Sequence, residues 1–180
     1  MSRLYGKPLM TQEAMRARVR ELGNEITRDY RDKDLMVIGI LKGAFTFFAD
    51  LTRAIRLPLQ IDFLMVKSQK AKRGQSAKVK VLSDLTEDIK GRHVLIVEDI
   101  VDSGRTVEQL MKRLKKRKPS SLEVCALLSK TVRRQIPVKV QYVGFEISDH
   151  YVVGYGMDYQ QKYRNLPYVG VLDSELREPS

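Results

Sequence analysis

The chain has 180 residues, 43% of them hydrophobic, so it can bury one substantial core and we expect a single domain over residues 1–180. Its 33 basic against 22 acidic residues give a net charge of +11, which indicates anionic partners, either nucleic acid or highly phosphorylated small molecules. The single cysteine, Cys125, excludes an internal disulfide and no apolar run is long enough to span a membrane, so we expect a cytoplasmic protein without membrane contacts.

A helix, a strand and a second helix are predicted first. Residues 11–30 carry apolar side chains at helical spacing, with Thr11 as the N-cap. Leu35–Leu41 is predicted to form a buried strand, and a helix follows whose apolar face runs from Phe45 to Ile55. Lys42-Gly43 lies between the two, so this junction is a candidate anion site, although a glycine there more often serves a tight turn.

Two short strands, Ile61–Val66 and Val79–Leu82, are expected to pair with each other. The segment that joins them, about residues 67–80, is polar and basic, so we expect it to be mobile. Two interpretations stand at this point: a simple hairpin loop, or an active-site lid that excludes water from a reactive intermediate.

The stretch V-L-I-V-E-D-I-V-D-S-G-R-T, residues 94–106, carries the strongest chemical signal in the chain. Val94–Val97 suits a strand that is buried on both faces of a parallel sheet, and Glu98 and Asp99 close it. A polar turn with a glycine follows, and then a helix with an apolar face that begins at Val107. Because free backbone N–H groups and the positive end of the helix dipole converge at such a turn, it is predicted to bind phosphate.

The two acids make this site more specific than a phosphate cradle. Acids beside a bound anion repel it unless they face something else, such as sugar hydroxyls or a divalent metal. An isolated acidic pair is more often a solvated strand end, but the D-S-G-R-T that follows reverses that preference. A phosphate at one end and a diol or Mg²⁺ at the other describe a phosphorylated ribose.

Two further strands, Leu122–Leu128 and Val140–Ile147, continue the alternation of strands and helices. This order predicts an α/β fold with a doubly wound, mainly parallel sheet flanked by helices. The basic residues at 112–118 are read as a solvated helix end, with RNA binding as the alternative. Residues 148–172 hold five of the eight tyrosines, and these form either a hydrophobic cap or a pocket that stacks a flat heterocycle.

The motif V-E-D-I-V-D-S-G-R-T resembles the ribose-phosphate signature of the type I phosphoribosyltransferases. V-G-F-E-I-S-D-H-Y-V-V-G-Y-G-M-D-Y and Y-R-N-L-P-Y resemble the purine-binding end of the hypoxanthine-guanine phosphoribosyltransferase family, particularly its bacterial members. The resemblance covers nearly the whole chain and implies the type I fold, with a small hood built from the terminal segments. It also implies purine salvage by a homodimer or homotetramer. In that reaction Mg²⁺ assists transfer of 5-phosphoribosyl from phosphoribosyl diphosphate to N9 of hypoxanthine or guanine, giving IMP or GMP and pyrophosphate.

The resemblance assigns roles to the matching residues. The residues implied to bind the 5′-phosphate are Ser103, Gly104, Arg105 and Thr106. Glu98 and Asp99 are implied to contact the ribose hydroxyls, and the residues implied to bind pyrophosphate are Lys42, Gly43 and Arg164. Lys130, Tyr151 and Val152 are implied to bind the purine, and Asp158, with Glu98 and Asp99, is implied to bind Mg²⁺. Asp102 is implied to transfer the proton at purine N7. The peptide bond between Leu41 and Lys42 is implied to adopt a cis form.

One departure and two alternatives follow from the same resemblance. Ser68 and Gln69 stand where the family's lid carries a Ser-Tyr pair, so the aromatic cover is missing here. Lys130 selects oxopurines over adenine but does not rank hypoxanthine, guanine and xanthine, so a xanthine-preferring enzyme is one alternative. A nucleic-acid-binding regulator on the same fold is the other; it accounts for the +11 charge, but no RNA-binding module is recognisable.

Overall fold

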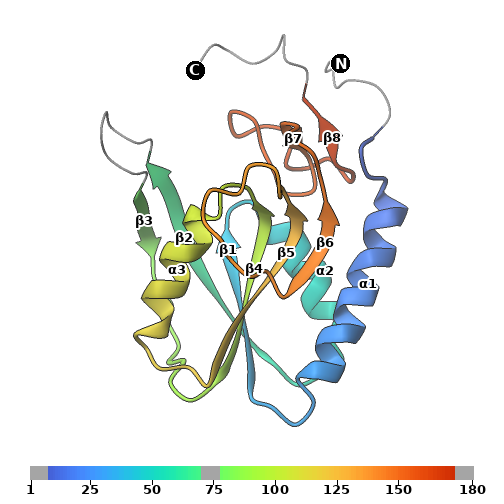
Figure 1. Ribbon diagram of the computed structural model, residues 1–180. Coiled ribbons are helices and arrows are strands. Elements are labelled where there is room, and N and C mark those ends of the chain that lie inside the picture. The colour runs from blue at the N-terminus through green and yellow to red at the C-terminus, as the bar shows by residue number, and fades with distance from the viewer. Residues whose placement is uncertain (1–7, 70–77, 173–180) are drawn as a thin grey trace.

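The computed structural model describes residues 8–69 and 78–172, and its centre is a six-stranded sheet in the order β3-β2-β1-β4-β5-β6 (Figure 1). The elements are α1 Gln12–Asp29, β1 Leu35–Leu41, α2 Phe45–Ala54, β2 Gln60–Gln69, β3 Lys78–Ser83, β4 His93–Val101, α3 Arg105–Lys115, β5 Ser121–Ser129, β6 Tyr142–Glu146, β7 Val152–Val153 and β8 Gly170–Val171. Strands β2, β1, β4, β5 and β6 run parallel, whereas β3 is antiparallel to β2. This is the mainly parallel α/β sheet that the sequence predicts.

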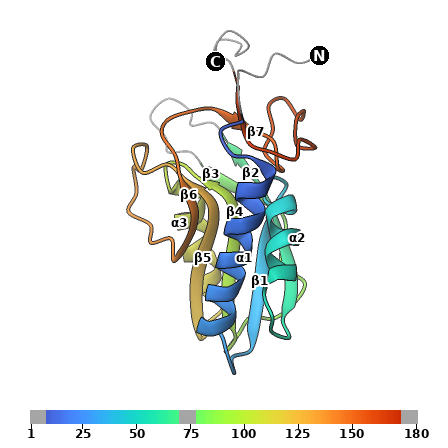
Figure 2. The same cartoon turned by 90° about the vertical axis from the view of Figure 1, so that its right-hand side faces the viewer.

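Helices cover both faces of the sheet, and the central strands are apolar for that reason. Helices α1 and α2 lie side by side on one face, and α3 covers the other (Figures 1 and 2). Side chains alternate along β4, so Leu95 and Val97 join the core beneath α1 and α2, whereas Val94 and Ile96 join the core beneath α3. All four are fully buried, which confirms the prediction of a strand covered on both faces.

The first two elements begin where the sequence predicts, and the second helix buries Phe48, Leu51 and Ile55 of its predicted apolar face but not Phe45. The Thr11 hydroxyl accepts a hydrogen bond from the Ala14 N–H at 3.2 Å and caps α1. In α2 the buried aromatic residues are Phe47 and Phe48, whereas Phe45 is 45% exposed. The prediction that Phe45 lies on the buried face is therefore wrong, because the first residue of α2 lies at the rim of a pocket and not over the sheet.

The strand that carries the acidic pair is longer than predicted. The sequence predicts that Glu98 and Asp99 close the strand, but β4 continues to Val101. Pairing with β5 persists at Glu98 with Ala126 and at Val101 with Ser129. Backbone pairing with β5 therefore extends β4 through Glu98 and Asp99, the polar residues at which the sequence pattern predicts that the strand ends.

The segment predicted as a mobile lid, about residues 67–80, overlaps the sheet at both of its ends. Strands β2 and β3 pair through Lys67 with Lys80, Ser68 with Val79, and Gln69 with Lys78, so both ends of the segment belong to the sheet. The rest of the predicted lid lies outside the described residues.

A small hood lies beyond the carboxyl ends of the parallel strands (Figure 1). Strands β7 and β8 pair antiparallel within it, and Met10 forms a bridge with Val169, so segments near both ends of the chain build it, as predicted. Within the described ranges, no helix is both long and apolar enough to cross a bilayer.

Candidate active site

The predicted phosphate turn lies between β4 and the N-terminus of α3. Gly104 has φ +84°, and a Cβ added there would lie 2.7 Å from the Ile136 carbonyl oxygen, so only glycine fits this turn. The Ser103 carbonyl accepts hydrogen bonds from the backbone N–H groups of Gln135 and Ile136, both at 3.1 Å. Because the first N–H groups of a helix have no partner within it, the turn presents donors at the positive end of α3.

The Lys42-Gly43 turn joins β1 to α2 and meets two other parts of the chain. The Leu41–Lys42 peptide bond is cis, as the resemblance implied. A Cβ added to Gly43 would lie 1.8 Å from Asp99 Oδ2, and one added to Gly156 would lie 2.2 Å from the Gly43 carbonyl oxygen. The turn is therefore packed between the acid on β4 and the segment that follows β7.

The two adjacent acids of β4 lie in different surroundings, because neighbouring residues of a strand point to opposite faces. Burial, with a smaller contribution from the charge of Asp99, raises the pKa of Glu98 well above its ordinary value. Burial also raises the pKa of Asp99 to about 6, although the Ile100 N–H, at 2.9 Å, and the charge of Arg164 oppose the rise. Glu98 Oε2 is buried and has no hydrogen-bond partner within the described part of the chain.

Arg164 and Asp158 come from the hood and form an ion pair at 2.7 Å. Arg164 also donates to the Gly156 carbonyl at 2.8 Å, and the Gln161 N–H donates to Asp158 Oδ2 at 2.8 Å. Gly156, whose carbonyl accepts from Arg164, packs against Gly43, and Gly43 lies against Asp99, so this part of the hood lies close to the acid on β4. The fold thus brings the predicted pyrophosphate and magnesium residues to one end of the sheet.

Lys130, which follows β5, lies between two carboxylates. Its ammonium is 3.9 Å from Asp102 Oδ2 and 3.5 Å from Asp149 Oδ1, and only 6% of the side chain is exposed. The Lys130 N–H donates to the Val101 carbonyl at 3.0 Å, which ties the end of β5 to the end of β4. The ends of adjacent parallel strands are where ligands bind in sheets of this kind.

The predicted base-stacking residue lies on the surface of the hood. The Tyr151 ring is 39% exposed, and its hydroxyl donates to the Asp158 carbonyl at 3.3 Å. Tyr159 packs against it edge-on, with ring centroids 5.8 Å apart. Val152 is buried as the first residue of β7, and its backbone pairs with Val171.

Several functional-site residues give no local signal in the sequence. Asp149 pairs with Lys130, and Arg133 pairs with both Asp102 and Asp149, but the two residues lie in irregular segments without a periodic pattern. Within residues 8–69 and 78–172, no group of three or more His, Cys, Asp or Glu side chains is arranged to hold a metal. The three predicted metal ligands, Glu98, Asp99 and Asp158, therefore do not form a ready-made carboxylate cage.

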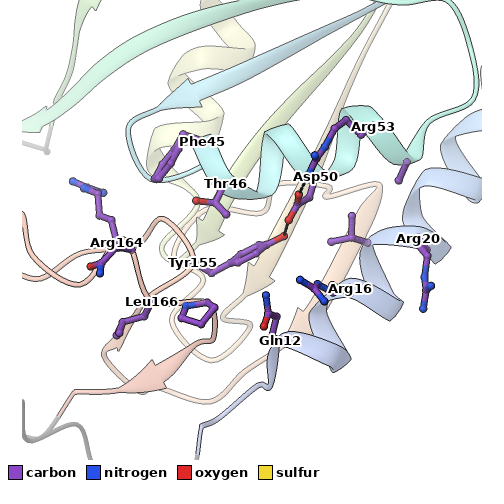
Figure 3. A pocket seen from close by; sticks show the side chains of 14 residues that line it. Gln12, Arg16, Arg20, Phe45, Thr46, Asp50, Arg53, Tyr155, Arg164 and Leu166 are labelled. Carbon is purple, nitrogen blue, oxygen red and sulfur yellow. Dashed lines mark hydrogen bonds and ion pairs between the residues drawn. The ribbon is translucent and has the colours of Figure 1, made fainter.

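A pocket of about 730 Å³ lies beside this site, between α1, α2 and the hood (Figure 3). Arg164 lines it together with Arg16, Arg20 and Arg53, and the Tyr155 hydroxyl donates to Asp50 Oδ2 at 2.6 Å. Of the residues that the sequence predicts to bind substrate, this pocket includes Arg164 and none of the others in the described ranges. The other predicted residues lie elsewhere: Glu98 and Asp99 are within β4, and Ser103 and Gly104 form the turn between β4 and α3.

The comparisons with known proteins agree with this geometry. A model of the phosphoribosyl transferase domain matches residues 7–160. The chain is 46% identical to the hypoxanthine phosphoribosyltransferase of Salmonella typhimurium, over 90% of this chain and 92% of that protein. It is 49% identical to the hypoxanthine-guanine phosphoribosyltransferase of Mycobacterium avium, over 93% of this chain and 86% of that one.

A solved structure indicates the same family as the sequence matches do. The crystal structure of a hypoxanthine phosphoribosyltransferase from Staphylococcus aureus superposes with a TM-score of 0.92 at 40% identity, covering 96% of this chain and 94% of that one. These matches confirm the predicted type I fold and enzyme class, and support neither the xanthine-preferring enzyme nor the nucleic-acid-binding regulator. The chain belongs to the hypoxanthine-guanine phosphoribosyltransferase family of purine-salvage enzymes.

Proposed function

We propose that this protein transfers the 5-phosphoribosyl group of phosphoribosyl diphosphate to N9 of hypoxanthine or guanine and releases pyrophosphate. The observation that carries the proposal is the pairing of Asp102 with Lys130, 3.9 Å apart at the end of the central strands. A 6-oxopurine has its 6-oxo oxygen and N7 side by side on one edge. The Lys130 ammonium donates to the oxygen, and the Asp102 carboxylate accepts the N7 proton as N9 attacks the ribose.

The rest of the purine contacts come from the hood. The exposed ring of Tyr151 supplies a flat apolar surface for stacking, and the Val152 backbone meets the edge of the base. Adenine has an amino group in place of the 6-oxo oxygen, so it offers Lys130 no acceptor. Selectivity for oxopurines follows, because the adenine amino group is a hydrogen-bond donor and would face the Lys130 ammonium, which is also a donor.

The ribose diphosphate fits the two turns and the acids between them. The backbone from Ser103 to Thr106 binds the 5′-phosphate, and Glu98 and Asp99 hydrogen-bond the ribose hydroxyls. Positive charge develops on the ribose as pyrophosphate leaves, and nearby carboxylates stabilise it. Lys42, the Gly43 backbone and Arg164 bind the departing pyrophosphate.

Magnesium fits the oxygen donors of Asp158, Asp99 and Glu98. Mg²⁺ usually takes one or two protein carboxylates and completes its shell with water and substrate phosphates, so the lack of a three-carboxylate cage suits it. Glu98 Oε2, buried without a partner in the described chain, is a further oxygen available to ribose or metal. When bound, the ion neutralises charge on the diphosphate leaving group.

The test measures pyrophosphate release from phosphoribosyl diphosphate and Mg²⁺, with hypoxanthine, guanine, xanthine and adenine offered separately. We expect release with hypoxanthine or guanine and none with adenine. Release with adenine at a similar rate would contradict the role of Lys130, and no release with any base would contradict the proposed activity.

We also propose a homodimer or homotetramer located in the cytoplasm. The family resemblance supports both statements, and the free cysteine, Cys125, is compatible with a reducing compartment. Light scattering during size-exclusion chromatography measures the oligomeric state, and a monomer at micromolar concentration would contradict it.

A further inference from the structure

Four charged side chains form a closed cluster at the purine end of the site. Lys130 lies 3.9 Å from Asp102 and 3.5 Å from Asp149. Arg133 lies 3.7 Å from the same Asp102 carboxylate and 3.3 Å from the same Asp149 carboxylate. Each cation therefore faces both acids, and the four charges cancel.

Burial distinguishes the members of this cluster. The Lys130 side chain is 6% exposed, whereas Asp102, Asp149 and Arg133 are 44%, 54% and 54% exposed. A buried ammonium requires a counter-ion, while exposed ion pairs contribute little. The ion pairs that neutralise Lys130 are therefore expected to contribute most to the stability of this cluster.

The reaction places conflicting demands on Lys130 and Asp102. Asp102 must accept a proton from purine N7. If Asp102 were the only counter-ion of the Lys130 ammonium, this ion pair would hold the Asp102 carboxylate away from the base. Asp149 gives Lys130 a second and nearer carboxylate, at 3.5 Å against 3.9 Å. Lys130 then remains anchored when Asp102 turns to the purine.

We propose that Asp149 is a positioning residue for the reaction, which holds the Lys130 ammonium toward the 6-oxo group and leaves Asp102 available to N7. The inference rests on the proposed roles of Lys130 and Asp102. Asp149 stands two residues before Tyr151, so the loop that presents the stacking ring also holds the ammonium that reads the base. Binding of an oxopurine is thereby coupled to the conformation of the loop.

Asp149→Asn tests this role, because it keeps the shape of the side chain and removes its charge. We expect the KM for hypoxanthine to rise roughly tenfold, the scale expected for loss of a charge-assisted hydrogen bond. The kcat and the KM for phosphoribosyl diphosphate should stay within roughly twofold of the wild-type values. Asp149→Glu should restore most of the hypoxanthine KM, because it restores the carboxylate.

Two readouts separate positioning from a structural role. Unsubstituted purine lacks the 6-oxo group, so its inhibition constant against hypoxanthine should be the same for wild type and Asp149→Asn. In a Lys130→Met background, Asp149→Asn should raise the hypoxanthine KM no further, because the two residues act through one contact. Asp34→Asn, which removes the exposed acid of a 2.7 Å ion pair with Arg92 at the opposite end of the sheet, is the matched control and should leave all these constants unchanged.

The inference fails if Asp149→Asn leaves the hypoxanthine KM unchanged. It also fails if the variant weakens purine, hypoxanthine and phosphoribosyl diphosphate equally, or if its effect adds fully to that of Lys130→Met. Failure of the proposed function is a different result, since wild-type protein would then release no pyrophosphate with any oxopurine.

Discussion

Gly43 lies directly against the carboxylate of Asp99, so closely that a Cβ on Gly43 would be 1.8 Å from Asp99 Oδ2. The two residues are far apart in sequence, but β1 and β4 are neighbours in the sheet and their carboxyl ends lie together. The contact joins the turn proposed to bind pyrophosphate to an acid proposed to face the ribose. Space, and not backbone conformation, is what requires glycine at this position.

Gly43→Ala should therefore lower kcat/KM for phosphoribosyl diphosphate by about a hundredfold, because misplacement of a site by about 1 Å has effects of this size. Steady-state kinetics measure the loss. Gly91→Ala is the matched control: Gly91 has φ +74° and nothing within 4 Å of an added Cβ. It should lower the free energy of unfolding by about 1 kcal/mol and leave kinetics unchanged. Equal kinetics for Gly43→Ala and wild type would show that the turn tolerates the displacement.

Asp102→Asn should lower turnover by roughly 10²–10⁴, the usual scale for a general acid–base group. Binding of phosphoribosyl diphosphate should change little, since Asp102 is proposed to contact the base and not the ribose. Single-turnover rates and equilibrium titration with phosphoribosyl diphosphate measure the two effects separately. Near-normal turnover would remove Asp102 from this role.

Arg164→Lys should raise the KM for phosphoribosyl diphosphate roughly tenfold, because lysine keeps the charge but loses the planar fork of donors. Arg164 uses that fork to contact the Gly156 carbonyl and Asp158, at 2.8 and 2.7 Å. Arg53→Lys provides the control within the same pocket, since Arg53 pairs with Asp50 on an exposed face of α2. A similar KM change in both variants would argue against a specific role for the Arg164 donors.

Asp99→Asn should stabilise the protein at alkaline pH while impairing activity. Burial raises the pKa of Asp99 from its ordinary value of 3.8 to about 6. Between these pH values the folded protein binds a proton that the unfolded chain does not bind, so the free energy of unfolding falls as pH rises. We expect a gain of about 3 kcal/mol at pH 8 and only about 0.5 kcal/mol at pH 4, measured by urea denaturation.

Asp62→Asn should show the opposite sign and serves as the control for that experiment. Burial alone would raise the pKa of Asp62, but hydrogen bonds from the backbone N–H groups of Glu87, Phe63 and Thr86 lower it overall. Its ionised form therefore stabilises the fold above pH 3.8, and this contribution is lost as pH falls through the lowered pKa. The variant should lose roughly 1–3 kcal/mol at pH 8. A loss that does not shrink in acid would indicate that charge is not the cause.

The sequence by itself determined the elements that depend on neighbouring residues. Thr11 caps its own helix, and the run from Val94 to Val97 is apolar because both faces of its strand are covered. The turn before α3 needs Gly104 for its left-handed conformation. These are local effects of backbone conformation, capping and side-chain periodicity, which act over a few residues and can be read along the chain.

Only the tertiary structure decided which distant residues meet. Pairing with β5 carries β4 through Glu98 and Asp99, which local patterning treats as its end. The approach of Gly156 to Gly43 and the position of Asp149 beside Lys130 depend on where the hood lies over the sheet. Residues in irregular segments follow no periodic pattern, so the sequence does not indicate which way their side chains point. The pairing of Asp149 with the buried Lys130 is therefore known only from the folded structure.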